Sequence, residues 1–412
     1  MHWNRRDAVL LAWLWAVAAC GVFVGCPQNG TENANVIKIV SSLPRTGSAR
    51  AQTDTIVNGI KIALEEAKYQ VGDFKIDYVD WDDATAAAGQ WTAEQEASNA
   101  KKAVSDDDIM VYLGPYNSGA AKISMPILNL AGLLQISPST SWPGLTKPGK
   151  GDPNEPDVYR PTGKVHFFRV VPADDLQGPL GAKWAKEMGV SKVYVLDDNE
   201  VYGKGIATLF AAACEDLGIE VLGQESIDAR AQEFKSLMTK IRGLGPDLLY
   251  FGGTTQSKGG QIAKDMVAAG LNCKIMVPDA CYEEAFIESA GPENVNDRCC
   301  VTFGGMPPEE LKGPGKEFVE KYQSTYHSKP EAYAVYGYEA AKVALEAIAK
   351  AGKKDRAAIL EACRQIKDFD KGALGKWSFD ENGDTSLTTI SASEVKDGKF
   401  VFVKLLKQEE QK

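Results

Sequence analysis

Histidine is scarce in this sequence, which contains 3 histidines among 412 residues. Only His166 and His327 lie beyond the N-terminal segment, and no Cys-x-x-Cys pair occurs anywhere. Imidazole groups and paired thiolates are the usual protein ligands of zinc and of most transition metals. We therefore predict neither a metal site nor a cofactor.

Positive charge is in deficit, because 46 Lys and Arg face 56 Asp and Glu, for a formal net charge of −10. Binding to nucleic acid or to an anionic membrane surface needs a basic stripe that neutralises phosphate. We therefore exclude both as partners. A composition of 44% hydrophobic and 25% charged residues is typical of a soluble globular protein, and the length predicts two domains.

Long hydrophobic runs are absent beyond residue 35, and the one such run covers residues 8–24. Two arginines precede it and a polar stretch, 27–34, follows it. This layout is typical of an export signal, and the run is barely long enough to cross a bilayer. We assign residues 1–26 to the signal and 27–34 to a linker. An anchor helix, and twin-arginine export suggested by the paired arginines, remain the alternatives.

Two cysteines close this apolar run, and the residues before each resemble the lipobox at which bacterial lipoproteins are cleaved and acylated. We favour Cys26 as the lipidation site because it stands at the boundary between apolar and polar sequence. Phe23 occupies a position where the lipobox usually has Leu, which leaves Cys20 as the alternative. The expected location is the periplasm or another extracytoplasmic space, at the membrane.

Six further cysteines follow, and four of them lie within a window of under thirty residues. In an exported protein this crowding predicts at least one disulfide. The pairing stays open, because adjacent cysteines cannot both be assigned. The six are Cys214, Cys273, Cys281, Cys299, Cys300 and Cys363.

Apolar runs of strand length alternate with segments of helical periodicity along most of the chain. Residues 36–40 and 74–79 read as strands, and apolar residues at helical spacing from 56 to 67 separate them. A second such succession begins at residue 193. Repeated strand-helix units predict an α/β fold of two doubly wound parallel-sheet lobes with right-handed crossovers. A terminal hairpin around Asp397-Gly398 is expected to finish the second sheet.

The most informative stretch covers residues 109–141, where two apolar runs each end in a turn rich in hydroxyl side chains. A helix is expected to begin at Ser118, and its free N–H groups can face an anion bound at the carboxyl ends of the strands. We predict a carboxylate-binding cradle of Ser118, Ser139 and Ser141. The alternative is that these serines only cap a helix and form turns.

Three sharper motifs are rejected. Residues 144–151 fall one residue short of a nucleotide-binding loop, because Gly151 replaces the Ser or Thr that would hold magnesium. Residues 380–384 lack the spacing of a calcium loop, so a solvated turn is predicted there. No base accompanies the serines at the strand ends, so we predict that the protein is not an enzyme.

Several short motifs nevertheless follow one another in a recognisable order, after the lipobox-like signal. They are Tyr112-Leu113-Gly114-x-x-x-Ser118, Ile136-Ser137-Pro138, Asp174-x-x-Gln177-Gly178, Asp197-x-x-x-x-Tyr202-Gly203-x-Gly205, Tyr250-Phe251-Gly252-Gly253 and Pro278-Asp279. Together they resemble the branched-chain amino acid binding proteins of ABC importers, which are type I periplasmic binding proteins. The match covers nearly all of the mature chain.

This resemblance implies two lobes joined by three hinge crossings that close on a ligand. Lobe one would comprise residues 35–171 and 304–380, and lobe two residues 172–303 and 381–412. The implied partners are a small amino acid and the permease subunits in the membrane, and the protein is expected to be a monomer. An aliphatic or branched-chain amino acid is the first expectation, and a urea, short amide or aromatic acid is the alternative.

The resemblance also implies roles for individual residues. The implied ligand-binding set is Ser118, Ser139, Thr140, Ser141, Tyr202, Thr254 and Asp279. The serines would hold the α-carboxylate, and Asp279 would pair with the α-ammonium. From the residues alone, Asp279 could equally cap a helix and Tyr202 could be a packing residue.

Two departures from the family pattern affect the side-chain pocket. Thr254 stands where the family often has an aromatic residue after Gly-Gly, and Asp279 stands where the pattern has Glu. Trp142 and Tyr116 are the candidates for replacement apolar walls.

Overall fold

Residues 35–407 are described in the computed structural model of the protein. The predicted signal, the linker and both candidate lipidation sites, Cys20 and Cys26, lie outside these residues. Within residues 35–407, no helix has the length and the apolar character that a bilayer crossing requires.

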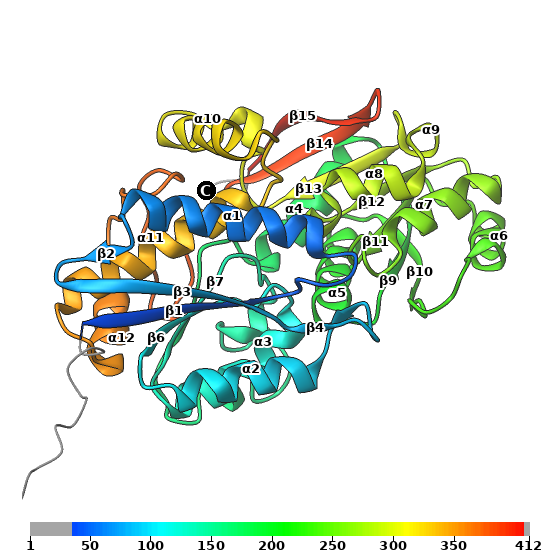
Figure 1. The fold of residues 1–412 in the computed structure, drawn as a ribbon. Coiled ribbons are helices and arrows are strands. Elements are labelled where there is room, and N and C mark those ends of the chain that lie inside the picture. Colours follow the sequence, from blue (N-terminus) through cyan, green and yellow to red (C-terminus); the bar gives the residue numbers. More distant parts are fainter. Residues whose placement is uncertain (1–34, 408–412) are drawn as a thin grey trace, which may run out of the picture. The chain divides into compact units, whose positions relative to one another are not determined.

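The first sheet has six strands in the order β2-β3-β1-β6-β7-β8 (Figure 1). All neighbours are parallel except β2 and β3. The strands are β1 (Val36–Leu43), β2 (Gln70–Val71), β3 (Phe74–Asp82), β6 (Ile109–Leu113), β7 (Leu134–Ser137) and β8 (Phe167–Arg169). A separate short pair consists of β4 (Ala84–Thr85) and β5 (Gln90–Trp91).

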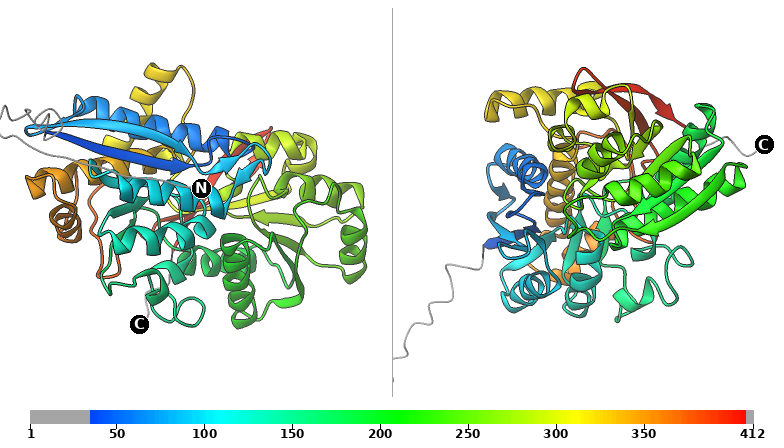
Figure 2. Two further views of the ribbon diagram at one scale, coloured as in Figure 1. Left: turned by 60° about the horizontal axis from the view of Figure 1, so that its bottom comes forward. Right: turned by 90° about the vertical axis from the view of Figure 1, so that its right-hand side faces the viewer.

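Helices cover both faces of this sheet. On one face α1 and α11 lie side by side, as Figure 1 and the right-hand view of Figure 2 show, and α2 packs with α3 on the other face. The helices of this lobe are α1 (Arg50–Glu66), α2 (Ala93–Ser105), α3 (Ser118–Leu130), α10 (Pro314–Tyr326), α11 (Ala334–Ala351) and α12 (Arg356–Arg364).

The second sheet has seven strands in the order β10-β9-β11-β12-β13-β14-β15. Its first five strands are parallel, and the terminal hairpin adds two antiparallel strands, drawn in red in Figure 1. The strands are β9 (Lys192–Asp197), β10 (Glu220–Ser226), β11 (Leu248–Gly252), β12 (Lys274–Val277), β13 (Cys299–Phe303), β14 (Ile390–Lys396) and β15 (Lys399–Leu406).

The second sheet also carries helices on both faces. Apolar residues of α4 and α5 form one buried cluster with it, and those of α6, α7 and α8 join the larger core on the opposite face. The helices are α4 (Asp174–Glu187), α5 (Val201–Asp216), α6 (Lys235–Leu244), α7 (Gly259–Ala268), α8 (Glu284–Ala290) and α9 (Pro292–Val295).

The chain therefore forms two doubly wound α/β lobes, as predicted. It crosses between the sheets after β8, after β13 and before β14. The parallel strands of each sheet follow the chain order 2-1-3-4-5, which places a switch point between β1 and β6 and another between β9 and β11. Ligands of such folds bind outside the carboxyl ends of the strands, at the switch point.

The disulfide predicted from the cysteine window is wrong, because all six cysteines of the described residues are free and buried. Cys299 and Cys300 are neighbours in β13, so their side chains point to opposite faces of the sheet. Cys299 joins the core cluster that contains Cys273 and Cys281, and Cys300 joins the cluster that contains Cys214. These thiols fill core space as small apolar groups.

Candidate functional site

Ser118 and Ser139 extend from the carboxyl ends of the neighbouring strands β6 and β7. The helix α3 begins at Ser118, as the sequence predicts, and its N-cap residue Asn117 makes no capping hydrogen bond. The Ser118 hydroxyl accepts a hydrogen bond from the Trp142 backbone N–H at 3.3 Å. The Ser139 hydroxyl donates to the Tyr116 carbonyl at 3.0 Å. The two serines thus tie the ends of both strands together and leave the first N–H groups of α3 without intrahelical partners.

Thr140 and Ser141 continue the same loop and are buried. Neither hydroxyl oxygen has a hydrogen-bond partner among the described residues. The Ser137 hydroxyl accepts from the backbone N–H groups of Ser139 at 3.2 Å and Thr140 at 3.0 Å. These two backbone donors are therefore already used within the loop, and the hydroxyl groups are the donors that remain.

Asp279 follows β12 in the second lobe and is 3% exposed. Its carboxylate accepts hydrogen bonds from the hydroxyls of Tyr202 and Tyr333 and from the Gln177 amide, the last at 3.0 Å. Burial raises the pKa of Asp279 and outweighs the opposing effect of these three donors. The side chain is therefore a buried acid surrounded by three neutral donors, with no cation beside it.

Tyr202 lies in the first turn of α5, and Thr254 follows β11. The Thr254 backbone N–H donates to the Ser257 hydroxyl at 2.8 Å, and that hydroxyl donates to Asp198 at 2.6 Å. Burial raises the pKa of Asp198 to about 7. Thr254 is thus part of a fixed turn whose polar groups are bonded to one another.

A small cavity of about 20 Å³ lies where these elements meet. It is lined by Tyr116, Asn117, Ser118, Ser139, Tyr202, Thr254, Ala280 and Tyr333. A second cavity of about 30 Å³ shares Asn117, Ser118, Tyr202 and Thr254 with the first and extends to Trp91 and Glu200. Each has room for one or two water molecules. A solute of amino-acid size therefore needs the lobes to move apart.

The structure brings together four of the seven predicted residues as cavity lining, namely Ser118, Ser139, Tyr202 and Thr254. Asp279 lies directly behind the lining residue Tyr202, and the loop residues Thr140 and Ser141 follow Ser139 without lining either cavity. Tyr116 contributes a wall of the first cavity. Trp142 lines neither cavity.

Neither Tyr333 nor Asp174 was predicted from the sequence as a site residue. Tyr333 directly precedes α11, where no periodicity or motif distinguishes it. Asp174 is fully buried, and its carboxylate makes no hydrogen bond of ordinary geometry in the described part of the chain, although the neighbouring Ser141 hydroxyl lowers its pKa by a smaller amount than burial raises it. Burial, and then the charge of Asp279, raise the pKa of Asp174 well above its usual value. Its place in the motif Asp174-x-x-Gln177 was the one available signal.

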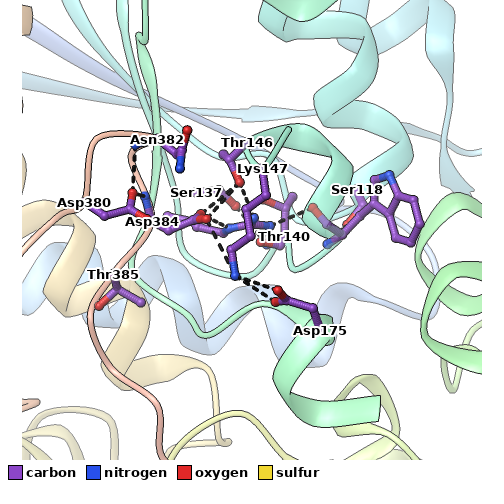
Figure 3. A network of polar contacts seen from close by, with 12 residues as sticks. Ser118, Ser137, Thr140, Thr146, Lys147, Asp175, Asp380, Asn382, Asp384 and Thr385 are labelled. Atoms are coloured by element: carbon purple, nitrogen blue, oxygen red, sulfur yellow. Dashed lines mark hydrogen bonds and ion pairs between the residues drawn. The ribbon is translucent and has the colours of Figure 1, made fainter. Parts of the chain in front are cut away.

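The turn at residues 380–384 is only partly solvated, which corrects the prediction for this segment. Asp384 is 5% exposed and forms an ion pair of 2.5 Å with Arg169, whose side chain is fully buried. Thr146 donates to the same carboxylate at 3.0 Å, as Figure 3 shows. Within residues 35–407, no three His, Cys, Asp or Glu side chains are grouped so that they could hold a metal ion.

A family model described as a periplasmic binding protein matches residues 36–399. The chain is 28% identical over 390 residues to Leu/Ile/Val-binding protein homolog 2 of Brucella abortus, over 92% of this chain and 97% of that protein. It is 27% identical to a leucine-, isoleucine-, valine-, threonine-, and alanine-binding protein of Pseudomonas aeruginosa, over 85% and 87% of the two chains.

Solved structures agree with this similarity. A leucine-binding protein of Thermotoga maritima superposes with a TM-score of 0.78 at 26% identity, over 90% of this chain and 98% of that chain. A solute-binding protein of R. palustris, crystallised with benzoate, shares the fold at 19% identity and a TM-score of 0.74, over 90% and 96%. The likeness therefore extends over nearly the whole of the described chain.

Proposed function

Because this chain belongs to the periplasmic binding protein family, we propose that it captures an amino acid between its two lobes and delivers it to the permease of an ABC importer. We propose an aliphatic or branched-chain side chain for that amino acid. The names of the Brucella and Thermotoga relatives support this choice. The lobe boundaries at residues 171–172, 303–304 and 380–381 are part of the same proposal.

The observation that carries the proposal is the cavity between the lobes. Ser118 and Ser139 line it from the first lobe, and Tyr202 and Thr254 line it from the second. A zwitterion can leave water only where its carboxylate and its ammonium both find partners. Donors at the start of α3 suit the carboxylate, and a buried acid behind Tyr202 suits the ammonium.

Each predicted residue then has a role in this proposal. Ser118, Ser139, Thr140 and Ser141 hold the α-carboxylate, and the two unpartnered hydroxyls of Thr140 and Ser141 gain their missing hydrogen bonds as the lobes adjust. Asp279 supplies the negative charge for the α-ammonium. Tyr202 and Thr254 close the site from the second lobe.

Anchoring and export complete the proposal. We infer that the chain is exported, acylated at Cys26 or at Cys20, and held by lipid at the membrane where the permease lies. It acts as a monomer and catalyses no reaction. Radiolabelled palmitate incorporated by the wild-type chain and lost from one of the variants Cys26→Ser and Cys20→Ser would identify the acylated residue.

A second candidate is a non-amino-acid solute such as urea, a short amide or an aromatic acid. One observation favours it: three protein donors already hydrogen-bond to Asp279, which lines neither cavity. A solute without an ammonium group would require no further partner for this carboxylate.

A thermal-shift panel on the purified full-length chain tests both candidates. The panel contains the common amino acids, urea, short amides and benzoate. The proposal predicts a raised melting temperature with leucine, isoleucine or valine, because a ligand that binds only the folded state stabilises it. A shift with amides or benzoate alone would favour the second candidate, and no shift with any member would contradict both.

A further inference from the structure

The segment 142–147, which we call the latch segment, follows directly after the loop that carries Ser139, Thr140 and Ser141. It belongs to the first lobe and contacts helices of the second lobe at two points, apart from its bonds to Asp384 in the third crossing. At the first point, the Trp142 ring lies against Gly205 of α5. A Cβ atom at position 205 would lie 2.3 Å from Cε3 and 2.5 Å from Cζ3 of that ring. Carbon atoms do not approach this closely, so the ring can occupy this place only because residue 205 has no side chain.

The second point is an ion pair. Lys147 Nζ lies 2.7 Å from Asp175 Oδ1 and 3.0 Å from Asp175 Oδ2, as Figure 3 shows. Asp175 lies in the first turn of α4, which packs on the second sheet. Both side chains are partly buried. The two contacts are therefore made by opposite ends of one short segment.

The latch segment is held firmly on the first lobe. Trp142 Nε1 donates to Glu155 at 3.0 Å, and the buried Arg169 donates to the Trp142 carbonyl at 2.8 Å. Thr146 donates to Asp384, the residue that also pairs with Arg169. Because the Trp142 backbone N–H donates to Ser118, the latch segment and the candidate carboxylate cradle form one connected unit.

We propose that the latch segment is a closing contact between the lobes, with the bare backbone of Gly205 as the seat of the Trp142 ring. This inference rests on the proposed capture of a ligand by lobe closure. A ligand held by both lobes gains affinity from every contact that forms only in the closed state, including contacts that do not touch the ligand. Gly205, Trp142, Lys147 and Asp175 thus regulate affinity from outside the cavity.

The substitution Gly205→Ala separates closure from folding stability. Alanine favours a helix interior over glycine, so α5 should keep or gain stability when the lobes are apart. In the closed state, however, the new methyl group collides with the Trp142 ring. We expect at least a tenfold weaker affinity for L-leucine by calorimetry, together with an unchanged or higher melting temperature without ligand.

The chain offers a matched control. Gly243 also lies inside a helix of the second lobe, and a Cβ atom there would meet nothing within 4 Å. Gly243→Ala should therefore leave affinity for L-leucine unchanged. A general effect of alanine on the second lobe would alter both variants alike.

Two further variants test the partners. Adding Trp142→Ala to Gly205→Ala removes the collision and should restore affinity to that of Trp142→Ala alone. Lys147→Met should weaken L-leucine binding by about two- to fivefold, which is typical for the loss of a partly exposed ion pair. Wild-type affinity in Gly205→Ala, or no recovery in the double variant, would overturn the proposal.

Small-angle scattering without ligand keeps this inference separate from the proposed function. Gly205→Ala should have a larger radius of gyration than Gly243→Ala, because its lobes cannot reach the described closed arrangement. If wild-type protein binds no amino acid, the proposed function fails and scattering alone tests the role of the latch segment. Equal radii of gyration for Gly205→Ala and Gly243→Ala would then overturn the latch proposal.

Discussion

At the scale of single residues, the site contains two buried acids, and the hydrogen bonds to them do not offset the effect of burial on their pKa values. Asp279 has three neutral donors, while the buried Asp174 has only the Ser141 hydroxyl beside it among the described residues. The charge of Asp279 contributes to the raised pKa of Asp174, and burial is the larger cause. A buried carboxylate is favourable only when it is protonated or meets a cation. Both acids thus bias the cleft toward a ligand with a positive group.

Replacing Asp279 tests that bias. Asp279→Asn keeps the size of the side chain and an oxygen that accepts from Tyr202 or Tyr333, so the fold should persist. Removing the charge should cost about 1.5 to 3 kcal/mol of amino-acid binding, roughly ten- to a hundredfold in Kd. Calorimetry with L-leucine measures this, and Asp216→Asn on the exposed side of α5 is the control. Unchanged affinity would favour a solute without an ammonium group.

A further buried acid makes the free energy of unfolding depend on pH. Glu96 of α2 is fully buried and accepts hydrogen bonds from Ser42 at 2.7 Å and Tyr112 at 3.0 Å. Burial nevertheless raises its pKa to about 7. The folded chain therefore holds a proton that the unfolded chain releases above about pH 4.5. The stability from this group is present at low pH and is lost as the pH rises through about 7.

The variant Glu96→Gln should remove this dependence. Between pH 5 and pH 8, wild-type protein should lose up to about 3 kcal/mol more unfolding free energy than the variant. Urea titrations at several pH values measure the difference. Glu94→Gln, on the exposed face of the same helix, should behave as wild type. Parallel pH profiles for Glu96→Gln and wild type would contradict the assignment.

At the scale of elements, the third crossing is attached to the end of β8. Arg169 is fully buried, and its guanidinium group meets Asp384, Thr146 and the Trp142 carbonyl. The Arg169 backbone N–H also donates to the Gly383 carbonyl at 3.1 Å. The candidate cradle and the crossing before β14 are therefore fixed to each other through one side chain.

Neutralising Asp384 should loosen this attachment. Asp384→Asn leaves the Arg169 charge buried without its partner, which should cost about 3 kcal/mol of unfolding free energy. Chemical denaturation measures this cost. The neighbouring Glu381 is exposed, so Glu381→Gln is the control and should change stability by less than about 0.5 kcal/mol. If Asp384→Asn also lost less than about 0.5 kcal/mol of unfolding free energy, the buried ion pair would be dispensable.

The accuracy of the sequence predictions varies among elements for physical reasons. The strand β6 and the start of α3 were predicted to the residue, because an apolar run meets a turn there and helical periodicity follows. The edge strand β10 was missed because only one of its faces is covered, and polar residues interrupt its pattern. The helix α7 was missed because it begins with two glycines.

The residues of the candidate site also differ in how well the sequence predicts them. Ser118 was predictable because it begins a helix after a parallel strand, where such folds place their ligands, whereas Tyr202 was implied only by the family resemblance. Tyr333 and the Arg169–Asp384 pair could not be derived, because their partners are distant in sequence. The cysteine window failed as a guide because adjacent residues of a strand point to opposite faces.

At the scale of the whole molecule, two lobes of the same strand order face each other with the candidate site between them. The largest apolar cluster includes residues of both sheets, so the crossings are built on a continuous core. The cavities in the closed arrangement have room for only one or two water molecules each. Ligand entry must therefore involve movement of one lobe against the other. The contacts of the latch segment stabilise the closed arrangement against that movement.

The central claim is that both charged groups of an amino acid are held at once between the lobes. The most direct test is a calorimetric comparison of L-leucine with 4-methylpentanoate, which lacks the ammonium group, and with isopentylamine, which lacks the carboxylate. We predict micromolar or tighter binding of L-leucine and at least a hundredfold weaker binding of both analogues. Equal binding of 4-methylpentanoate, or no binding of L-leucine or any other amino acid, would contradict the account.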